Sequence, residues 1–278
     1  MVKPLLRRAY RALTTPLDRL ATRELARAAH PDAPRLARVI EELARPLPAG
    51  DRAAIDAIER ARAGLLARTD PLDDGTLGGA LVHDRGLTVG EACVASKGPV
   101  PARALYALVR EFQPASILEL GTNVGISTAY LAAALRSLGG GGRTTTLEAS
   151  PYRLRVARET HHRLGLDGIS YRQGLFADTL EPALQEIGDV DFVFIDGYHQ
   201  YEPTLSCFGT IWKRSRPGAL FVFDDIRWSK GMRRAWKRLQ HDERLSLTAD
   251  LGCMGVAVGR SPRDASVYRS RRMYSVLR

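Results

Sequence analysis

The pattern of apolar and polar positions changes near residue 115 of the chain. Before this point apolar residues recur at three- and four-residue spacing, which predicts amphipathic helices. After it, short apolar runs alternate with stretches of helical spacing, which predicts strands separated by helices. Strands that alternate with helices form a parallel sheet covered on both faces. The predicted fold is therefore α/β, with a helical extension at the N-terminus.

The predicted strands are short apolar runs, and they cover residues 116–120, 143–147, 169–173, 191–195, 219–223, 245–249 and 254–258. The predicted helices of the same region cover residues 101–112, 126–138, 151–164, 179–187, 201–215 and 232–241. We expect the chain to divide into an N-terminal helical region, a linker with a ligand loop, a main α/β domain and a basic tail, at residues 1–70, 71–100, 101–260 and 261–278.

The N-terminal helical region has apolar stripes that need a partner. One predicted helix begins near Pro34 and carries Leu36, Val39 and Ile40 on one face. These stripes bury against the main domain or against a second subunit, and the region could also serve as a lid over a substrate. We expect packing or dimerisation. Glycine and aspartate dominate residues 70–90, which indicates a linker with a short hairpin.

The chain of 278 residues carries a formal net charge of +10. Basic residues gather in 3–45 and 260–278, which is typical of a surface for nucleic acid or an anionic membrane, and also of solvated arginine-rich helix faces. Basic and aromatic residues do not interleave as they do on RNA-binding platforms. We therefore favour solvated helix faces and do not expect nucleic acid as a partner.

Several features favour a cytoplasmic protein. No apolar run approaches the roughly 18 residues that a membrane span needs. The N-terminus is too basic and too interrupted for a secretory signal. Cys93, Cys207 and Cys253 lie far apart without metal-ligand spacing, which is typical of a reducing compartment.

A glycine turn follows the first predicted strand. The sequence SILELGTNVGIS places Gly121 and Gly125 after the strand, and Ser127 near the start of the next helix. A strand, a glycine turn and a helix N-terminus form a cradle for polar or anionic groups. The spacing fits neither the dinucleotide fingerprint nor the P-loop.

In a parallel sheet, ligands bind beyond the carboxyl ends of the strands. Glu148 ends the second predicted strand, where it can accept hydrogen bonds from two ribose hydroxyls or cap the next helix. We favour the ribose. Phe176 follows the third strand and can lie against an adenine ring. His161 and His162 belong to a polar helix, and we expect both to face solvent.

The fourth and fifth strands deliver three carboxylates to the same edge: Asp196, Asp224 and Asp225. Carboxylates that converge need a cation, and oxygen ligands without cysteine suit Mg²⁺. Alternatively, Asp224 and Asp225 cap the next helix and pair with a nearby basic residue. His199 lies three residues after Asp196 and suits a general base, or is a surface histidine.

Taken together, these residues resemble the class I S-adenosylmethionine-dependent O-methyltransferases of the metal-dependent branch. The segment SKGPVPARALYALVREFQPASILELGTNVGIS is similar to the region leading into the first motif of catechol O-methyltransferases. The segments from GLFADTL to DGYHQY are similar to the macrocin- and mycinamicin-type sugar O-methyltransferases. The resemblance covers residues 93–258.

The resemblance implies a Rossmann-like fold with a seven-stranded, mostly parallel sheet. It places the cofactor, S-adenosylmethionine, against Glu119, Gly121, Thr122, Asn123, Gly125, Ser127, Glu148, Ala149, Phe176 and Asp196. It makes Asp196, Asp224 and Asp225 the ligands of Mg²⁺ and makes His199, with Asp196, catalytic. The catechol enzymes have asparagine where Asp225 stands, and many relatives have an acidic residue where Leu175 stands.

The implied function is methyl transfer to a hydroxyl of a small molecule, either a catechol or a sugar diol, with Mg²⁺ and His199 as general base. A homodimer through the N-terminal helices is the expected assembly. The alternatives are a metal-free or an RNA-directed methyltransferase of the same fold, and a non-catalytic module that binds the cofactor and acts through its helical N-terminus.

Overall fold

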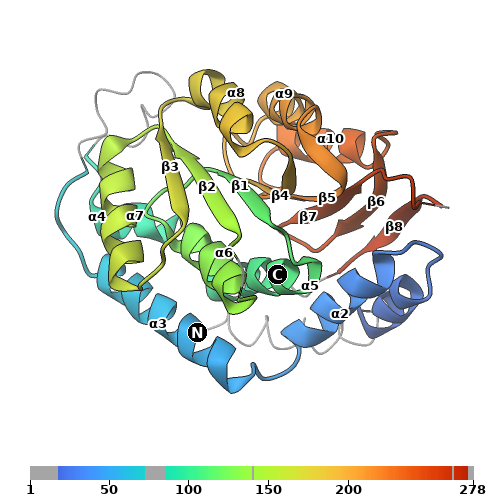
Figure 1. Ribbon diagram of the computed structural model, residues 1–278, viewed down its shortest axis with the longest axis horizontal. Helices are drawn as coiled ribbons and strands as arrows, with labels where there is room; N and C mark the ends of the chain where they lie inside the picture. Colours follow the sequence, from blue (N-terminus) through green and yellow to red (C-terminus); the bar gives the residue numbers. More distant parts are fainter. Residues whose placement is uncertain (1–17, 73–85, 140, 265, 275–278) are drawn as a thin grey trace.

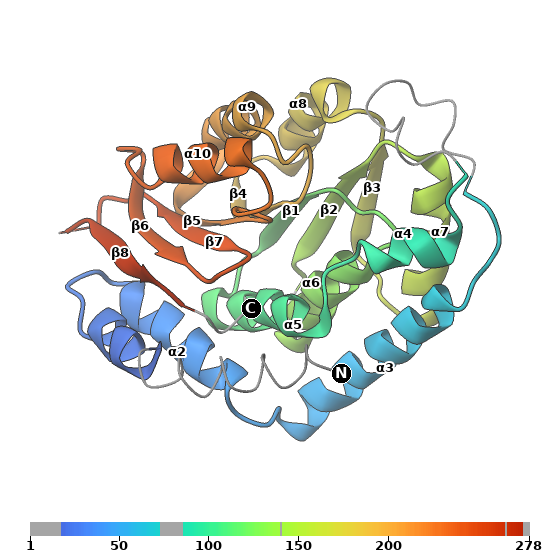
Figure 2. The ribbon, with the colours of Figure 1, turned by 180° about the vertical axis from the view of Figure 1, so that it is seen from behind.

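The computed structural model describes residues 18–72, 86–139, 141–264 and 266–274 (Figures 1 and 2). Within them one sheet runs through the middle, in the order β3-β2-β1-β4-β5-β7-β6-β8. The strands are β1 (Ser116–Leu120), β2 (Arg143–Glu148), β3 (Ile169–Gln173), β4 (Val190–Ile195), β5 (Ser215–Phe223), β6 (Leu245–Asp250), β7 (Gly255–Gly259) and β8 (Tyr268–Met273). The first five are parallel, and β7 is antiparallel to β5 and β6. The predicted α/β fold is confirmed.

Helices cover both faces of the sheet, and two more form an outer layer. On one face lie α8 (Phe176–Ile187), α9 (Tyr201–Trp212) and α10 (Lys230–Leu239) (Figure 1). On the other lie α4 (Val89–Val94), α5 (Pro99–Phe112), α6 (Ile126–Ser137) and α7 (Pro151–Arg163). Outside α5 and α6 run α2 (Ala33–Leu43) and α3 (Ala49–Leu66) (Figure 2).

The sheet separates two apolar cores because successive strand residues point to opposite faces. Ile117 of β1 packs in the core that contains α5 and α6. Its neighbour Leu118 packs in the core that contains α8, α9 and α10. Burial on both faces explains why the central strands read as nearly continuous apolar runs.

The N-terminal helices bury their apolar stripes against the main domain. Leu36 and Val39 of α2 and Ile58 of α3 are almost fully buried, in the same core as α5 and α6. A polar contact adds to this packing, since the Tyr106 hydroxyl of α5 donates to Asp51 Oδ1 of α3 at 2.8 Å. The stripes thus have a partner within the chain, while dimerisation remains a prediction.

The two ends of the described chain also meet. His30, between the first helical segment and α2, lies 3.0 Å from the Ser246 hydroxyl of β6. The Tyr274 hydroxyl, just after β8, donates to the Ala21 carbonyl oxygen at 3.2 Å. The edge of the sheet is thereby closed against the N-terminal helices.

Two elements were not expected from the sequence. β8 lies in the segment predicted to be a basic tail and pairs in parallel with β6. An edge strand needs no continuous apolar run, so its polar sequence hid it. α4 lies in the predicted linker, where Thr88 and Glu91 form a capping box. Of the predicted hairpin, only a bridge between Pro71 and Thr88 falls within the described residues.

Within the described residues, no helix combines the length and the apolar character needed to cross a bilayer.

Candidate functional site

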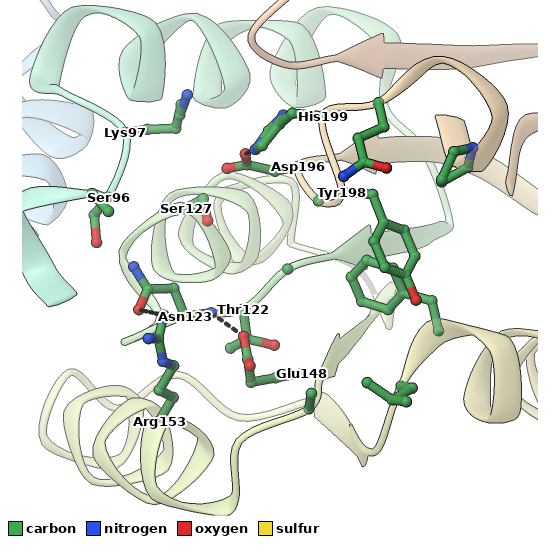
Figure 3. A pocket seen from close by; sticks show the side chains of 18 residues that line it. Ser96, Lys97, Thr122, Asn123, Ser127, Glu148, Arg153, Asp196, Tyr198 and His199 are labelled. Carbon is green, nitrogen blue, oxygen red and sulfur yellow. Dashed lines mark hydrogen bonds and ion pairs between the residues drawn. The ribbon is translucent and has the colours of Figure 1, made fainter. Parts of the chain in front are cut away.

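The carboxyl ends of β1, β2 and β4 open into a cavity of about 620 Å³ (Figure 3). β1 pairs with β2 on one side and with β4 on the other, so the cavity lies at the point where the strand order reverses. The residues that line it are Ala95, Ser96, Lys97, Gly121, Thr122, Asn123, Ser127, Glu148, Ala149, Arg153, Leu175, Phe176, Asp196, Gly197, Tyr198, His199, Gln200 and Pro203. Most of the predicted cofactor residues are therefore on its wall.

The glycine turn brings the ends of β1 and β4 into contact. Gly121 has φ +103°, and a Cβ there would lie 2.1 Å from the carbonyl oxygen of Asp196. Gly125 has φ +88°, and a Cβ there would lie 2.6 Å from Nε2 of His161. No other residue type fits either position, because both the backbone angle and the space exclude a side chain.

His161 supports the glycine turn from behind. Its Nε2 lies 2.7 Å from the Gly125 carbonyl oxygen, and its Nδ1 lies 2.7 Å from the Tyr171 hydroxyl. The carbonyl can only accept, so Nε2 carries the proton and Nδ1 accepts from Tyr171. Burial lowers the pKa of His161 to about 4. The expectation that His161 faces solvent was wrong, because a polar helix sequence does not reveal a ring inserted behind a neighbouring turn.

Glu148 is held by backbone groups at the end of β2. The Asn123 N–H donates to its Oε2 at 2.8 Å, and the Ser150 N–H donates to its Oε1 at 3.0 Å. A carboxylate has about four acceptor positions, so each oxygen keeps capacity for a ligand hydroxyl. Arg153 donates from Nη1 to Asn123 Oδ1 at 3.2 Å and fixes the amide beside it (Figure 3).

Two of the predicted cofactor residues do not line the cavity. Glu119 is fully buried beneath it, and its Oε2 accepts from the hydroxyls of Thr128 and, at 2.7 Å, Thr146. Burial raises the pKa of the Glu119 carboxyl. Gly125 lies in the turn behind the wall. Both can shape the site, while direct contact of either with a cofactor remains a prediction.

An aromatic pair forms the opposite wall of the cavity. The rings of Phe176 and Tyr198 meet edge to face, with their centroids 5.1 Å apart. Ala149 and Leu175 line the cavity as well. This wall is apolar enough to accept a flat ring, in agreement with the position predicted for Phe176.

The ends of β4 and β5 carry the predicted acid–base group. His199 Nε2 lies 3.6 Å from Asp196 Oδ1 and 4.0 Å from Asp225 Oδ2. Figure 3 shows His199 beside Asp196. Tyr198, His199 and Asp225 have φ values of +62°, +42° and +48°, in the left-handed region that non-glycine residues rarely adopt. Such backbone strain gathers at functional sites, and Asn123 on the β1 side of the cavity shares it, with φ +48°.

Lys97 completes this group, and the sequence gave no reason to assign it a role. Its ammonium contacts Asp224 Oδ2 and lies 3.5 Å from Asp225 Oδ1. Burial lowers the pKa of Lys97, but the carboxylates of Asp196, Asp224 and Asp225 outweigh burial and raise it above its usual value. The sequence shows only that Lys97 stands beside a glycine ahead of a helix. That pattern does not predict a contact with Asp224, which lies 127 positions later.

The donor set has the chemistry of a hard-cation site. Asp224 is fully buried, and within the described residues its Oδ1 has no hydrogen-bond partner. Burial, followed by the charge of Asp196, raises the pKa of Asp224 well above its usual value. Three oxygen-donating side chains and an unpartnered oxygen suit Mg²⁺. In the part of the chain that the structure describes, however, no group of three His, Cys, Asp or Glu side chains is already arranged to hold a metal ion.

The alternative role for Asp224 and Asp225 was pairing with basic residues of the following loop. Arg227 instead pairs with Asp250 of β6, with Nη2 and Oδ2 2.5 Å apart. Asp224 and Asp225 instead lie close to the ammonium of Lys97, which is in the connection between α4 and α5.

Comparison with known proteins agrees with the motifs. Residues 118–226 match the family described as a methyltransferase domain. A catechol O-methyltransferase of Niastella koreensis is 35% identical over 133 residues, which are 47% of this chain and 58% of that protein. A human transmembrane O-methyltransferase is 43% identical over 70 residues, which are 25% of this chain and 23% of that protein. The chain thus spans between about a quarter and three fifths of the length of these relatives.

A solved structure agrees over a larger region. The O-methyltransferase from Bacillus cereus in complex with SAH is 26% identical, with a TM-score of 0.52, and the match covers 77% of this chain and 92% of that one. The predicted resemblance to class I S-adenosylmethionine-dependent O-methyltransferases and the predicted Rossmann-like fold are confirmed. Each of these named relatives is an O-methyltransferase, which agrees with the predicted enzyme class.

Proposed function

We propose that this protein transfers the methyl group of S-adenosylmethionine to a hydroxyl of a small molecule. The observation that carries the proposal is one cavity in which a glycine turn and Glu148 lie opposite Asp196 and His199. The first pair suits a nucleoside, and the second pair suits removal of a proton. The Bacillus cereus neighbour, in complex with SAH, supports the same cofactor.

Glu148 orients the cofactor in this proposal. Its two oxygens accept hydrogen bonds from the ribose hydroxyls, while Asn123 and Ser150 hold the carboxylate still. The adenine ring lies against Phe176. The methionine end then reaches the turn at Gly121, and its ammonium lies near the Asp196 carboxylate. The sulfonium methyl faces the side of the cavity that holds His199.

His199 is the general base. As the acceptor oxygen attacks the methyl carbon, its proton passes to the imidazole, the carbon–sulfur bond breaks and S-adenosylhomocysteine leaves. Asp196 lies 3.6 Å from Nε2 and stabilises the imidazolium that forms. Much of the acceleration comes from holding the two reactants in line.

Asp196, Asp224 and Asp225 would hold Mg²⁺, and the unpartnered Asp224 oxygen supports this assignment. When bound, Mg²⁺ lowers the pKa of an acceptor hydroxyl and fixes its direction. A metal-free transferase of the same fold is the second candidate, and the contact of Lys97 with Asp224 favours it.

We propose a vicinal diol as the acceptor, either a catechol or a sugar. The support is the similarity to a catechol O-methyltransferase and the apolar wall next to the charged group. An aromatic acceptor gains from Tyr198, whose side chain is 38% exposed at the cavity.

Calorimetric titration of S-adenosylmethionine with Mg²⁺ and with EDTA tests the cofactor. We expect binding in both conditions, because Glu148, Gly121 and Phe176, which hold most of the cofactor in this proposal, are not among the proposed metal ligands. A screen of catechols and sugar diols with tritiated methyl donor then tests the acceptor. Absence of binding in both conditions would refute the proposal.

Asp196→Ala tests the chemistry, with turnover measured at saturating S-adenosylmethionine because Asp196 also lies near the ammonium of the cofactor. We expect turnover to fall by roughly a thousandfold, since an uncompensated imidazolium and an incomplete cation site both raise the barrier. Asp178→Ala, an exposed carboxylate at the start of α8, is the matched control.

A further inference from the structure

Lys97 occupies an unusual place for a lysine. Its side chain is only 10% exposed, in the four-residue connection between α4 and α5. Figure 3 shows it on the same side of the cavity as His199 and Asp196, away from Glu148 and Arg153. Its charge therefore acts on the half of the cavity where a proton is removed.

The charges around Lys97 require a cation. Three carboxylates face it, from Asp196, Asp224 and Asp225, and Asp224 has no exposure to solvent. His199 completes the surroundings, within 4.0 Å of Asp225 Oδ2. A buried carboxylate without a partner is strongly destabilising, and a contacting ammonium removes most of that cost. The side chain of Lys97 supplies the first positive charge to this group.

We propose that Lys97 is an internal cation of this carboxylate group, and that a divalent ion binds there only after the ammonium has left. The ammonium contacts Asp224 and lies 3.5 Å from Asp225. An Mg²⁺ ion held by the same two carboxylates would need the oxygens that the ammonium now contacts. Two cations cannot both occupy the position next to those oxygens, so lysine and metal are alternative occupants.

The chain allows this exchange. Lysine carries its charge on a flexible four-carbon stem, and residues 94 and 95, just before it, are exposed. Asp224 Oδ1, which the ammonium leaves without a partner, is a donor that a metal can use when Lys97 moves away. With the ammonium in place, the carboxylate group already has a positive charge close to His199.

This inference rests on the proposed function, which makes the three carboxylates metal ligands. The experiments below measure metal binding, so a failure of the inference can be distinguished from a failure of methyl transfer. It also explains why the described residues hold no ready-made set of three ligands although three carboxylates converge.

The first test compares metal affinity in three proteins. Mn²⁺ binding is measured by electron paramagnetic resonance, and Mg²⁺ binding by calorimetry, on the wild type, Lys97→Met and Lys230→Met. Lys230 is an exposed lysine at the start of α10 that contacts none of the carboxylates. We expect Lys97→Met to bind both ions at least tenfold more tightly than the wild type, and Lys230→Met to match the wild type. An affinity of Lys97→Met that is unchanged or lower would overturn the proposal.

Lys97→Met also leaves Asp224 without its cation, which can weaken folding. Lys97→Gln keeps a hydrogen-bond donor and is the second variant, with the same expected gain in metal affinity. S-adenosylmethionine binding reports whether either variant is folded.

A second test needs no variant. Amine-reactive labelling of the wild type is followed by mass spectrometry without metal and at an Mg²⁺ concentration that saturates binding. We expect labelling of Lys97 to rise severalfold with Mg²⁺, because the displaced ammonium becomes accessible, while labelling of Lys230 stays constant. Lys97 labelling that is unchanged or lower at saturation would show that lysine and metal bind side by side, and the proposal would be wrong.

Discussion

The two halves of the cavity are built on opposite principles. In the half formed by β1 and β2, backbone N–H groups meet Glu148, and the ring of His161 meets the Gly125 carbonyl. In the half formed by β4 and β5, three carboxylates converge on one ammonium, and Asp224 keeps an unpartnered oxygen. In the first half the groups around the cavity are held mainly by neutral backbone and ring partners, although within the described residues Glu119 Oε1 beneath it also accepts no hydrogen bond. In the second half, charged side chains contact one another.

This difference suggests that the β1/β2 half binds the cofactor and the β4/β5 half carries out the reaction. Groups with satisfied hydrogen bonds hold a ligand in one geometry without rearrangement, which suits a cofactor that every reaction shares. Closely spaced charged groups respond strongly to a cation or a proton, which suits the reacting centre. Substitutions on the two sides should therefore affect different measurements.

Replacing His199 should have the largest effect, and only on turnover. We expect His199→Ala to lower kcat by about 10²- to 10⁴-fold, the usual contribution of a general base. The dissociation constant of S-adenosylmethionine should stay within about twofold, because the cofactor does not depend on this ring. His162→Ala, an exposed histidine of α7, is the matched control in both assays. Equal losses in binding and turnover would mean that the two halves are not separable.

Replacing Glu148 should have the reverse pattern. Glu148→Gln removes a charged acceptor from the ribose, and hydrogen bonds to charged groups contribute about 1.5–3 kcal/mol each. We expect the affinity for S-adenosylmethionine to fall by roughly 10- to 100-fold, with the same factor for adenosine. Turnover at saturating cofactor should change little. Calorimetry on Glu181→Gln, an exposed glutamate of α8, controls for the lost charge. If Glu148→Gln bound adenosine as tightly as the wild type does, Glu148 would not be the residue that binds the ribose.

Replacing His161 should change kcat and the affinity for S-adenosylmethionine less than the two substitutions above. Its main effect should be on the free energy of unfolding. Its pKa is about 4 in the folded protein against an ordinary 6.5, so its contribution to stability is complete above pH 6.5. As the pH falls from 6.5 towards 4, the unfolded chain takes up the proton first, and stability declines by about 1.4 kcal/mol per pH unit. Over that range the loss reaches roughly 3 kcal/mol.

Urea unfolding at pH 7, 6, 5 and 4 measures this loss. We expect His161→Gln, which has no titrating ring, to lack that share of the acid-dependent decline, whereas His162→Gln should follow the wild type. If the free energy of unfolding fell equally with pH in the wild type and in His161→Gln, His161 would not be a buried neutral ring.

The fold and the outer parts of the site could be predicted because local rules determine them. Apolar runs and helical spacing located the strands, and the parallel order placed their carboxyl ends at one edge. That rule alone was enough to bring Glu148, Asp196 and Asp224 to one edge. The sequence makes no prediction of the strand order, but any parallel arrangement of these strands places the three residues at the same edge.

The rest depends on contacts that a single sequence does not encode locally. Lys97 meets Asp224 across 127 positions, and His161 meets the Gly125 carbonyl across 36. Glu119 looked like a wall residue but lies beneath the cavity, because β1 is buried on both faces. β8 has the composition of a solvated tail and was found only through its pairing with β6.

The contact between the chain ends affects how the protein folds during synthesis. Tyr274 bonds to the Ala21 carbonyl, and Ser246 to His30, over separations of 253 and 216 positions. Contacts of such separation form late, because a long loop must close first. As the chain leaves the ribosome, α2 and α3 can pack on α5 and α6, but residues 21–30 wait for β6 and for the residue after β8. Nascent chains that stall or end early therefore expose apolar helix surface, and they are the forms most prone to aggregate.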